Sequence, residues 1–284
     1  ERRIPAFWEV AARAGLRTSV IQWWATWPAA EDGEDTGVVL SDRALLRLEQ
    51  GGTLDGEIAP AALYQSLEET WAARRARVGT VAQSAAADMP ADVAAIVSRS
   101  ASLDATIVDL AQERALSNVD LQVLYLPGLD IAQHALLTGT TATAPSAVAA
   151  RVQAIERYYV FLDGLLDALP RTDRTVMLVL QPGRVTTPGS GLLALAGVPA
   201  RRGATVSTTA ESVAATALYL LGVPVAKDLA QPVAEPLLAP AFTAAHPTRF
   251  IDTYGARHLA PRRTSGQPLD QEMIERMRSL GYVK

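Results

Sequence analysis

The sequence has no cysteine among its 284 residues. This absence excludes disulfide bonds, thiolate metal sites and cysteine nucleophiles. It leaves the cellular compartment open, because a chain without cysteine tolerates oxidising and reducing surroundings equally.

Long apolar runs and positive charge are lacking as well. The best apolar run, 217–221, is far shorter than the roughly 20 residues that span a bilayer, and it stops at Gly222 and Pro224. The formal net charge is −4, and no stripe of lysine and arginine with interleaved aromatic residues is present. A nucleic-acid partner is therefore not expected. The glycine motifs of P-loop and Rossmann nucleotide sites are absent too.

What the chain does have is enough apolar material for a core, since 49% of its residues are hydrophobic. This fits one large domain, or one and a half ordinary ones. The chain starts at Glu1, without a methionine at its start, in a helix-like segment, and it shows no signal peptide. We therefore expect it to be a piece of something longer.

Apolar segments of helical and of strand character alternate along the chain. Helices are predicted over 4–14, 146–166 and 210–221, and buried strands over 18–24, 38–40, 120–126, 175–180 and 192–196. Strands that are apolar on both faces are typical of a parallel sheet covered by helices. The pattern predicts an α/β fold with a doubly wound, mostly parallel sheet flanked by helices and a helical insertion.

Composition changes divide the chain into four parts. Residues 1–59 are predicted to form the first part of the α/β core, and 117–229 the rest of it. The alanine-rich block 60–116 reads as a helical cap or insertion, with a loop over 82–91. Residues 230–284 are rich in proline and predict an extended C-terminal tail with a final helix over 271–280.

The sharpest local feature is the pair Asp130 and His134, four residues apart just after the strand 120–126. On a first helical turn this spacing directs both side chains the same way. It also places them at the carboxyl end of a strand, where α/β proteins have their sites. Two such groups can hold one face of a zinc ion. The alternative is an aspartate that caps a helix and a lone histidine in an ordinary hydrogen bond.

Three tryptophans, Trp23, Trp24 and Trp27, follow the first strand. They favour packing in the core or under a cap. As an exposed cluster they would indicate a binding surface.

Five stretches, taken in chain order, resemble the type I phosphodiesterases and nucleotide pyrophosphatases of the alkaline phosphatase superfamily. Tyr-Leu-Pro-Gly-Leu-Asp-Ile-Ala-Gln-His, ending at His134, is similar to the Asp-x-x-x-His metal motif of that family. The other four are at 4–28, 197–203, 220–228 and 278–283. The resemblance spans most of the chain and implies the family's α/β fold.

The resemblance also implies a two-metal site that this chain does not complete. In active members, one metal is bound by the aspartate and histidine that correspond to Asp130 and His134, together with a later histidine. The other metal is bound by an upstream aspartate, a threonine or serine nucleophile and an Asp-His pair. Gln181 and Pro182 stand where that Asp-His pair is expected, and 184–191 contains no histidine. His246 and His258 fall in the tail, beyond the ligand positions. A two-metal clamp for phosphoryl transfer is therefore not expected.

Two functions of different classes follow. The first is a non-catalytic phosphodiesterase-like domain, with no catalytic residue and no cofactor, in which Asp130 and His134 are a remnant of the metal site. It would be a structural or interaction subunit with a protein partner, on the extramembrane face of a membrane complex and hence periplasmic or extracytoplasmic. The alternative location is cytoplasmic.

The second function is a zinc-dependent phosphodiesterase or pyrophosphatase whose nucleophile lies upstream of Glu1. A third reading keeps one structural metal at Asp130 and His134.

Overall fold

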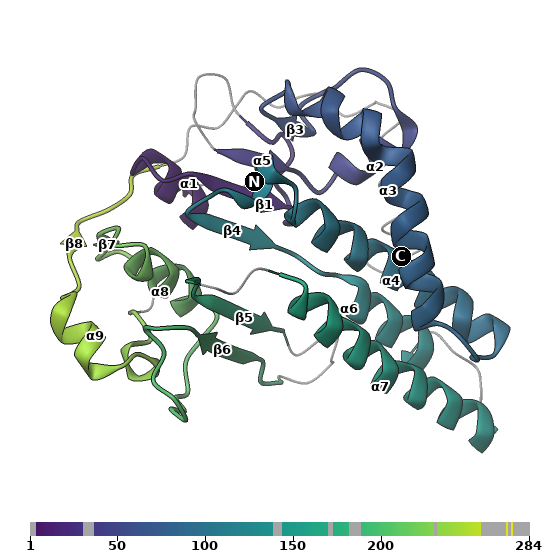
Figure 1. The fold of residues 1–284 in the computed structure, drawn as a ribbon. Coiled ribbons are helices and arrows are strands. Elements are labelled where there is room, and N and C mark those ends of the chain that lie inside the picture. The colour runs from purple at the N-terminus through teal and green to yellow at the C-terminus, as the bar shows by residue number, and fades with distance from the viewer. Residues whose placement is uncertain are drawn as a thin grey trace.

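A mixed sheet of four short strands forms the centre of the molecule (Figure 1). The computed structural model describes residues 4–30, 37–138, 144–169, 173–181, 189–229 and 232–256, together with Gln271 and Ile274. The strand order is β3-β2-β1-β4. β1 pairs in parallel with β2 and with β4, whereas β2 and β3 are antiparallel. The strands are β1 (Thr18–Ile21), β2 (Val38–Leu40), β3 (Ile58–Ala59) and β4 (Leu121–Leu124).

Alternate residues of each strand point to opposite faces of this sheet. Both faces are covered by buried apolar residues. Ile21 and Leu40 belong to a buried cluster with residues of the helices within 44–117. Val20, Val39 and Val123 belong to a second cluster with Trp8. The predicted α/β layering is therefore observed for this sheet, in a mixed form with one antiparallel pair.

The first helix, α1 (Phe7–Arg13), lies within the predicted range 4–14 but begins three residues later. The Glu9 carboxylate accepts a hydrogen bond from the backbone N–H of Ala6, 2.8 Å away, which satisfies a donor at the start of the helix. Gly15 follows the helix with φ of 85°, a conformation that glycine adopts without strain.

The block 60–116 is helical, as predicted, and its long helices are α3 (Leu63–Ala85) and α4 (Ala91–Ala111). They pack side by side, with α2 (Ala44–Gln50) before them and α5 (Arg114–Ser117) after them. The predicted loop over 82–91 is shorter than expected, because α3 continues to Ala85. Leu67 and Trp71 of α3 are buried in the same cluster as Ile21 of the sheet. The block therefore contributes directly to the core on one face of the sheet.

After β4 the chain forms α6 (Gly128–Gln133), a π-helical turn η1 (His134–Thr138) and the long helix α7 (Pro145–Asp167). These elements pack against α4. Ile155 and Tyr158 of α7 are buried, but Val148, Val152 and Tyr159 of the predicted apolar stripe are exposed. The stripe is therefore covered only in part.

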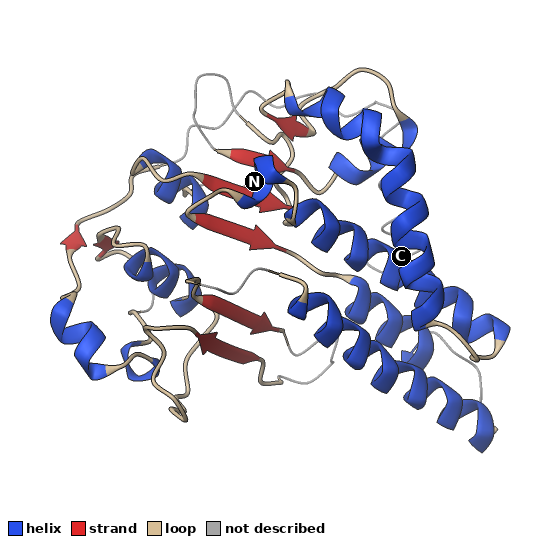
Figure 2. Cartoon of the chain, viewed as in Figure 1, coloured by secondary structure: helices blue, strands red, loops and turns tan. Residues whose placement is uncertain are grey.

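The strands β5 (Val176–Leu180) and β6 (Leu192–Ala196) pair with each other in an antiparallel two-stranded sheet (Figure 2). The prediction that they are buried strands is wrong: Val176, Leu180 and Leu192 are exposed. Among the described strands neither pairs with β1 to β4. Their apolar composition is that of a covered sheet, yet part of that surface faces solvent.

The remaining described elements lie beside this small sheet. They are α8 (Ser212–Leu220), β7 (Val225–Ala226), the 3₁₀ turn η2 (Glu235–Leu237), α9 (Pro240–Ala245) and β8 (Phe250–Ile251). Gln271 and Ile274 are helical, and the other residues of the predicted final helix lie outside the described residues. Within the described part of the chain, no helix is both long and apolar enough to cross a membrane.

Candidate functional site

The carboxyl ends of β1, β2 and β4 meet at one edge of the sheet, because β1 is parallel to both neighbours. The segments that leave this edge are 22–28, 41–43 and 125–130. In α/β proteins ligands bind at this edge of the sheet. It is therefore the candidate functional site, and Asp130 lies in it, as the sequence predicted.

The backbone just after β1 is held in an uncommon conformation. Gln22 and Ala25 have φ of 60° and 54°, in the left-handed region. Such residues cost on the order of 1–3 kcal/mol each and persist where their surroundings hold them. Gln22 is held on both sides: its N–H donates to Leu40 O at 2.8 Å, and its side-chain amide donates to Ser41 O at 2.8 Å.

Aromatic rings line the same edge. Trp23 and Trp24 both make edge-to-face contacts with Tyr125, at centroid distances of 6.2 Å and 6.1 Å. Trp23 also packs against the buried Trp8. Trp23, Trp24 and Tyr125 are half-buried. They therefore pack partly in the core and partly at the surface, which lies between the core packing and the exposed cluster that the sequence left open.

Asp42 and Arg43 follow β2 and enclose the third tryptophan. The Asp42 carboxylate accepts a hydrogen bond from the N–H of Trp27 at 3.0 Å. The Arg43 guanidinium carbon lies 3.8 Å from the centre of the Trp27 ring, a cation–π contact. Burial raises the pKa of the Asp42 carboxyl, and this hydrogen bond opposes the shift.

The predicted pair Asp130 and His134 lies on one helical stretch. Asp130 is in the first turn of α6, and His134 directly follows that helix as the first residue of the π-helical turn η1. Backbone N–H groups at this junction donate to the carbonyls of Asp130 and Ile131. One helical turn separates the two residues, and both are half-buried. The spacing therefore places them on one face, as expected.

The imidazole of His134 has a hydroxyl neighbour. Its Nδ1 lies 2.7 Å from Oγ1 of Thr138, which also donates to the carbonyl of His134 at 2.7 Å. Ligating histidines commonly use the second ring nitrogen in such a contact, which orients the ring. π-helical turns such as η1 occur often at functional sites.

Of the other positions that the sequence analysis considered, the structure describes Gln181 and His246. Gln181 directly follows β5 and is exposed, whereas Pro182 and His258 lie outside the described residues. His246 follows α9, where its ring stacks on Phe242 and its Nδ1 contacts the Phe242 carbonyl at 3.0 Å. Within the described ranges, no three histidine, aspartate or glutamate side chains gather closely enough to hold a metal ion.

A buried polar cluster at the start of α6 was missed by the sequence analysis. Asp104 of α4 is fully buried, and its Oδ1 accepts a hydrogen bond from the N–H of Gly128 at 2.8 Å. Its Oδ2 accepts one from the hydroxyl of Tyr158 in α7 at 2.9 Å. We call Asp104, Tyr158 and Gly128 the Asp104 cluster. The only signal in the sequence is an aspartate in the apolar stripe of a helix.

Burial sets the protonation chemistry of this cluster. Loss of solvation raises the pKa of the Asp104 carboxyl to about 7, although the bonds from Gly128 and Tyr158 favour its charged form. The pKa of the Tyr158 hydroxyl is also raised, first by burial and then by the neighbouring carboxylate. The start of α6 is thus tied to α4 and α7 through a carboxyl group that titrates near neutral pH.

Comparison of the chain with models of known protein families, with curated proteins and with solved structures gave no match.

Proposed function

We propose that this chain is a phosphodiesterase-like domain of the alkaline phosphatase superfamily that acts without catalysis, as a structural or interaction subunit. The chain order of the five motif-like stretches supports the family. The partner is a protein, and the proposal includes an extracytoplasmic position on a membrane complex, as the resemblance implies. The observation that carries the interaction role is a partly exposed apolar face on the β5–β6 sheet.

This face, called here the open face, consists of alternate residues of the two strands. The pairing register places three pairs on one side of the sheet: Val176 with Ala196, Leu178 with Ala194, and Leu180 with Leu192. On the other side Leu195 packs against the cluster of α8. The open face is therefore the side away from that contact.

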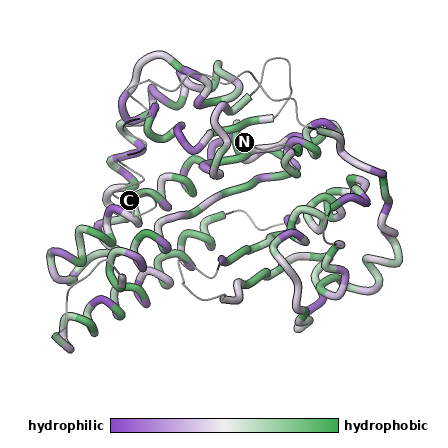
Figure 3. Tube along the Cα trace, turned by 180° about the vertical axis from the view of Figure 1, so that it is seen from behind, coloured by the Kyte–Doolittle hydropathy of each residue, from purple (hydrophilic) through white to green (hydrophobic). Residues whose placement is uncertain are grey.

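All six residues of the open face are apolar, and several are accessible to solvent. Leu192 is 53% exposed, Val176 41% and Leu180 38%. Figure 3 shows hydrophobic residues along both strands. A contiguous apolar surface of this kind marks an interaction site in soluble proteins.

The chemistry of the strands indicates what covers them. Neither strand contains a charged residue, so a charged partner surface would lose its hydration here without compensation. We therefore expect an apolar segment of a partner protein. β5 also has one edge that pairs with no described strand, and an extended partner segment can add to such an edge.

The test is site-specific photocrosslinking from position 192 in cells, combined with matched charge substitutions. Leu192→Glu is expected to weaken partner binding by about ten- to a hundredfold, because the Leu side chain contributes roughly 1.5–3 kcal/mol when buried. Val198→Glu is the control, since Val198 is 90% exposed just outside β6. Light scattering of the purified chain distinguishes a second copy from a different protein. The proposal fails if position 192 crosslinks to nothing, or if both substitutions weaken the same contact equally.

A metal-dependent phosphodiesterase is the second candidate, favoured by the half-buried Asp130 and by the π-helical turn at His134. Metal analysis of the full-length protein and hydrolysis of a nitrophenyl phosphodiester separate the two functions. The non-catalytic proposal predicts no hydrolysis above background. Zinc near one equivalent, with activity that Asp130→Asn abolishes and Asp92→Asn preserves, would overturn it.

A further inference from the structure

The Asp104 cluster joins three helices at the point where the candidate site begins. Asp104 comes from α4, Tyr158 from α7, and Gly128 is the first residue of α6. Asp104 and Tyr158 are both fully buried. Asp130 and His134 follow Gly128 on the same helical stretch, so their position depends on how this start is held.

Gly128 fits the cluster so tightly that no side chain has room there. A Cβ atom at this position would overlap with the Tyr158 hydroxyl, the Asp104 carboxylate and the carbonyl of Ser100. The close approach brings the Gly128 N–H onto Oδ1 of Asp104. The contact thus forms only where three separate parts of the chain pack together.

Among the described residues, the carboxyl group of Asp104 forms no ion pair, and its two hydrogen bonds come from Gly128 and Tyr158. The influences on its pKa are burial and the bonds from Gly128 and Tyr158. Ionisable groups on the other elements that pack against α4 include Arg74 and Arg77 of α3, which pair with Asp109 and Glu113; Arg151 of α7, which pairs with Asp92; Asp130 and His134 of the α6–η1 stretch; and Arg114 of α5. The other charged residues of α3 and α7 are Glu68, Glu69, Arg75, Glu156, Arg157, Asp163 and Asp167. β4 contains no ionisable residue.

The two protonation states of Asp104 make different contacts. As a carboxylate it accepts both hydrogen bonds, and bonds to a charged acceptor are shorter and stronger. When the carboxyl is protonated, one oxygen becomes a donor, so the Tyr158 hydroxyl must change its role or lose its acceptor. The bond to Gly128 then has a neutral, weaker acceptor.

We propose that Asp104 is a pH-sensitive contact that sets how firmly the start of α6, and with it Asp130 and His134, is held against α4 and α7. Ionisation strengthens the two individual hydrogen bonds but places a charge in the interior, and the cost of burial outweighs those bonds. The neutral form is therefore held more firmly, and the hold weakens as the carboxyl loses its proton. This inference does not depend on the proposed interaction role, because the cluster is internal to the chain.

Carboxyl-carbon NMR of the whole chain, with ¹³C-labelled aspartate, tests the contact directly. We expect one aspartate, absent from the spectrum of Asp104→Asn, to titrate with a midpoint near 7. The amide proton of Gly128 should shift with the same midpoint, because its acceptor changes charge. The inference is overturned if no aspartate titrates within about one unit of pH 7, or if the Gly128 amide does not follow it.

Two neighbouring tyrosines provide a matched pair of variants. Tyr158→Phe removes a bond to the carboxylate, so it should move the Asp104 midpoint to higher pH. Tyr159→Phe is the control, because the hydroxyl of Tyr159 is exposed and contacts Gln133. Equal midpoints in the two variants would contradict the proposed contact.

The pH dependence of stability gives an independent readout. The folded pKa is raised above the value in the unfolded chain, so the favourable contribution of Asp104 is fully present below about pH 4 and is lost as pH rises through about 7. The melting temperature of the wild type should therefore fall relative to that of Asp104→Asn as pH rises from 4 to 8. A constant difference across this range would rule out titration of Asp104 there.

Discussion

At the scale of a single residue, Gly128 is the position least tolerant of change near the candidate site. Its Cα faces the Tyr158 hydroxyl, the Asp104 carboxylate and the carbonyl of Ser100 with no space for a methyl group. Glycine is required here by this close approach and not by its φ angle. A local requirement of this kind comes from three segments that meet in space.

We predict that Gly128→Ala lowers the free energy of unfolding by about 1–3 kcal/mol, the usual cost of overfilling a packed site. Gly79→Ala is the matched control, because Gly79 lies inside α3 with open space around its Cα. That substitution should raise stability by roughly 0.5–1 kcal/mol through helix propensity. Urea unfolding measures both, and the same sign for the two variants would contradict this account.

The candidate ligands show what residue-level patterns predict and what they miss. The helical stretch that carries Asp130 and His134 follows from local spacing, and the structure contains it. Asp104 escaped prediction, because its partners lie 24 and 54 residues away along the chain. The interpretation of Asp130 and His134 as a remnant of a metal site stays a prediction.

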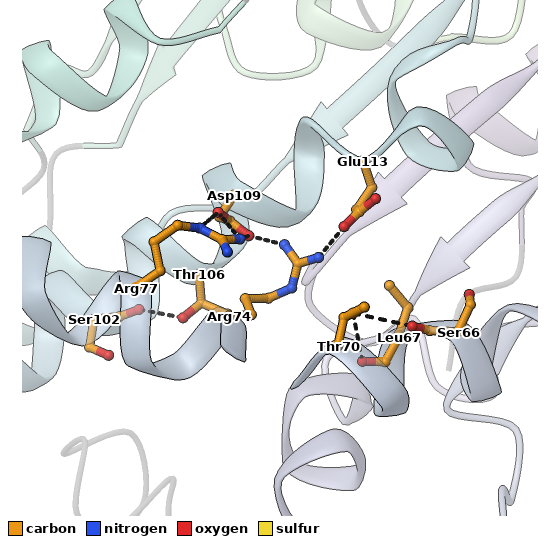
Figure 4. Close-up of polar contacts among 9 residues, drawn as sticks. All are labelled: Ser66, Leu67, Thr70, Arg74, Arg77, Ser102, Thr106, Asp109 and Glu113. Atoms are coloured by element: carbon orange, nitrogen blue, oxygen red, sulfur yellow. Dashed lines mark hydrogen bonds and ion pairs between the residues drawn. The ribbon is translucent and has the colours of Figure 1, made fainter. Parts of the chain in front are cut away.

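At the scale of elements, an ion-pair cluster around the buried Arg74 joins the long helix α3 to α4 and the residues just after it (Figure 4). The Arg74 side chain is 2% exposed and pairs with Asp109 and Glu113 of the α4 region. Arg77, one turn on, is exposed and also pairs with Asp109. The cluster orients two helices whose apolar residues cover the sheet.

We predict that Arg74→Met destabilises the chain by about 1–3 kcal/mol, because it removes buried hydrogen bonds and leaves Asp109 and Glu113 with fewer partners. The carboxylates are partly solvated and Asp109 keeps Arg77, which limits the loss. Arg77→Met should cost no more than about 1 kcal/mol, as is usual for exposed pairs. Thermal unfolding of the two variants tests the order, and an equal loss would show that burial of Arg74 adds nothing.

The strands β5 and β6 show the limit of prediction for elements. Their apolar residues predict strands, and strands are present. Burial was predicted wrongly, because an apolar run does not reveal which other segments will cover it. Which segments cover a strand is decided by tertiary packing, and here the open face is left partly exposed.

At the scale of the whole molecule, α1 joins the central sheet to the C-terminal elements. Val10 and Ala11 of α1 share a buried cluster with Leu218 of α8 and with Val223. The strands of the central sheet are covered on both faces, whereas β5 and β6 are partly exposed. Protection of backbone amides from hydrogen exchange should therefore differ between the two sheets.

We predict that amides in β1 and β4 exchange with solvent at least about tenfold more slowly than those in β5 and β6, because exposed, sparsely covered strands open more easily. Hydrogen-exchange mass spectrometry of peptides covering the four strands measures this. Binding of the proposed partner should slow exchange in β5 and β6 and leave β1 unchanged. Equal protection of all four strands in the isolated chain would contradict the prediction.

The sequence by itself determined the local elements: the helix before β1, the helical block 60–116, the strand β4 and the helical spacing of Asp130 and His134. Hydrophobic periodicity and helix-ending residues act over a few positions, so a linear pattern contains them. Only the tertiary structure decided that Asp104 is buried against Gly128 and Tyr158, and that β5 and β6 form a separate, partly open sheet. Burial and hydrogen bonding between distant residues depend on which segments pack together, and no local pattern encodes that choice.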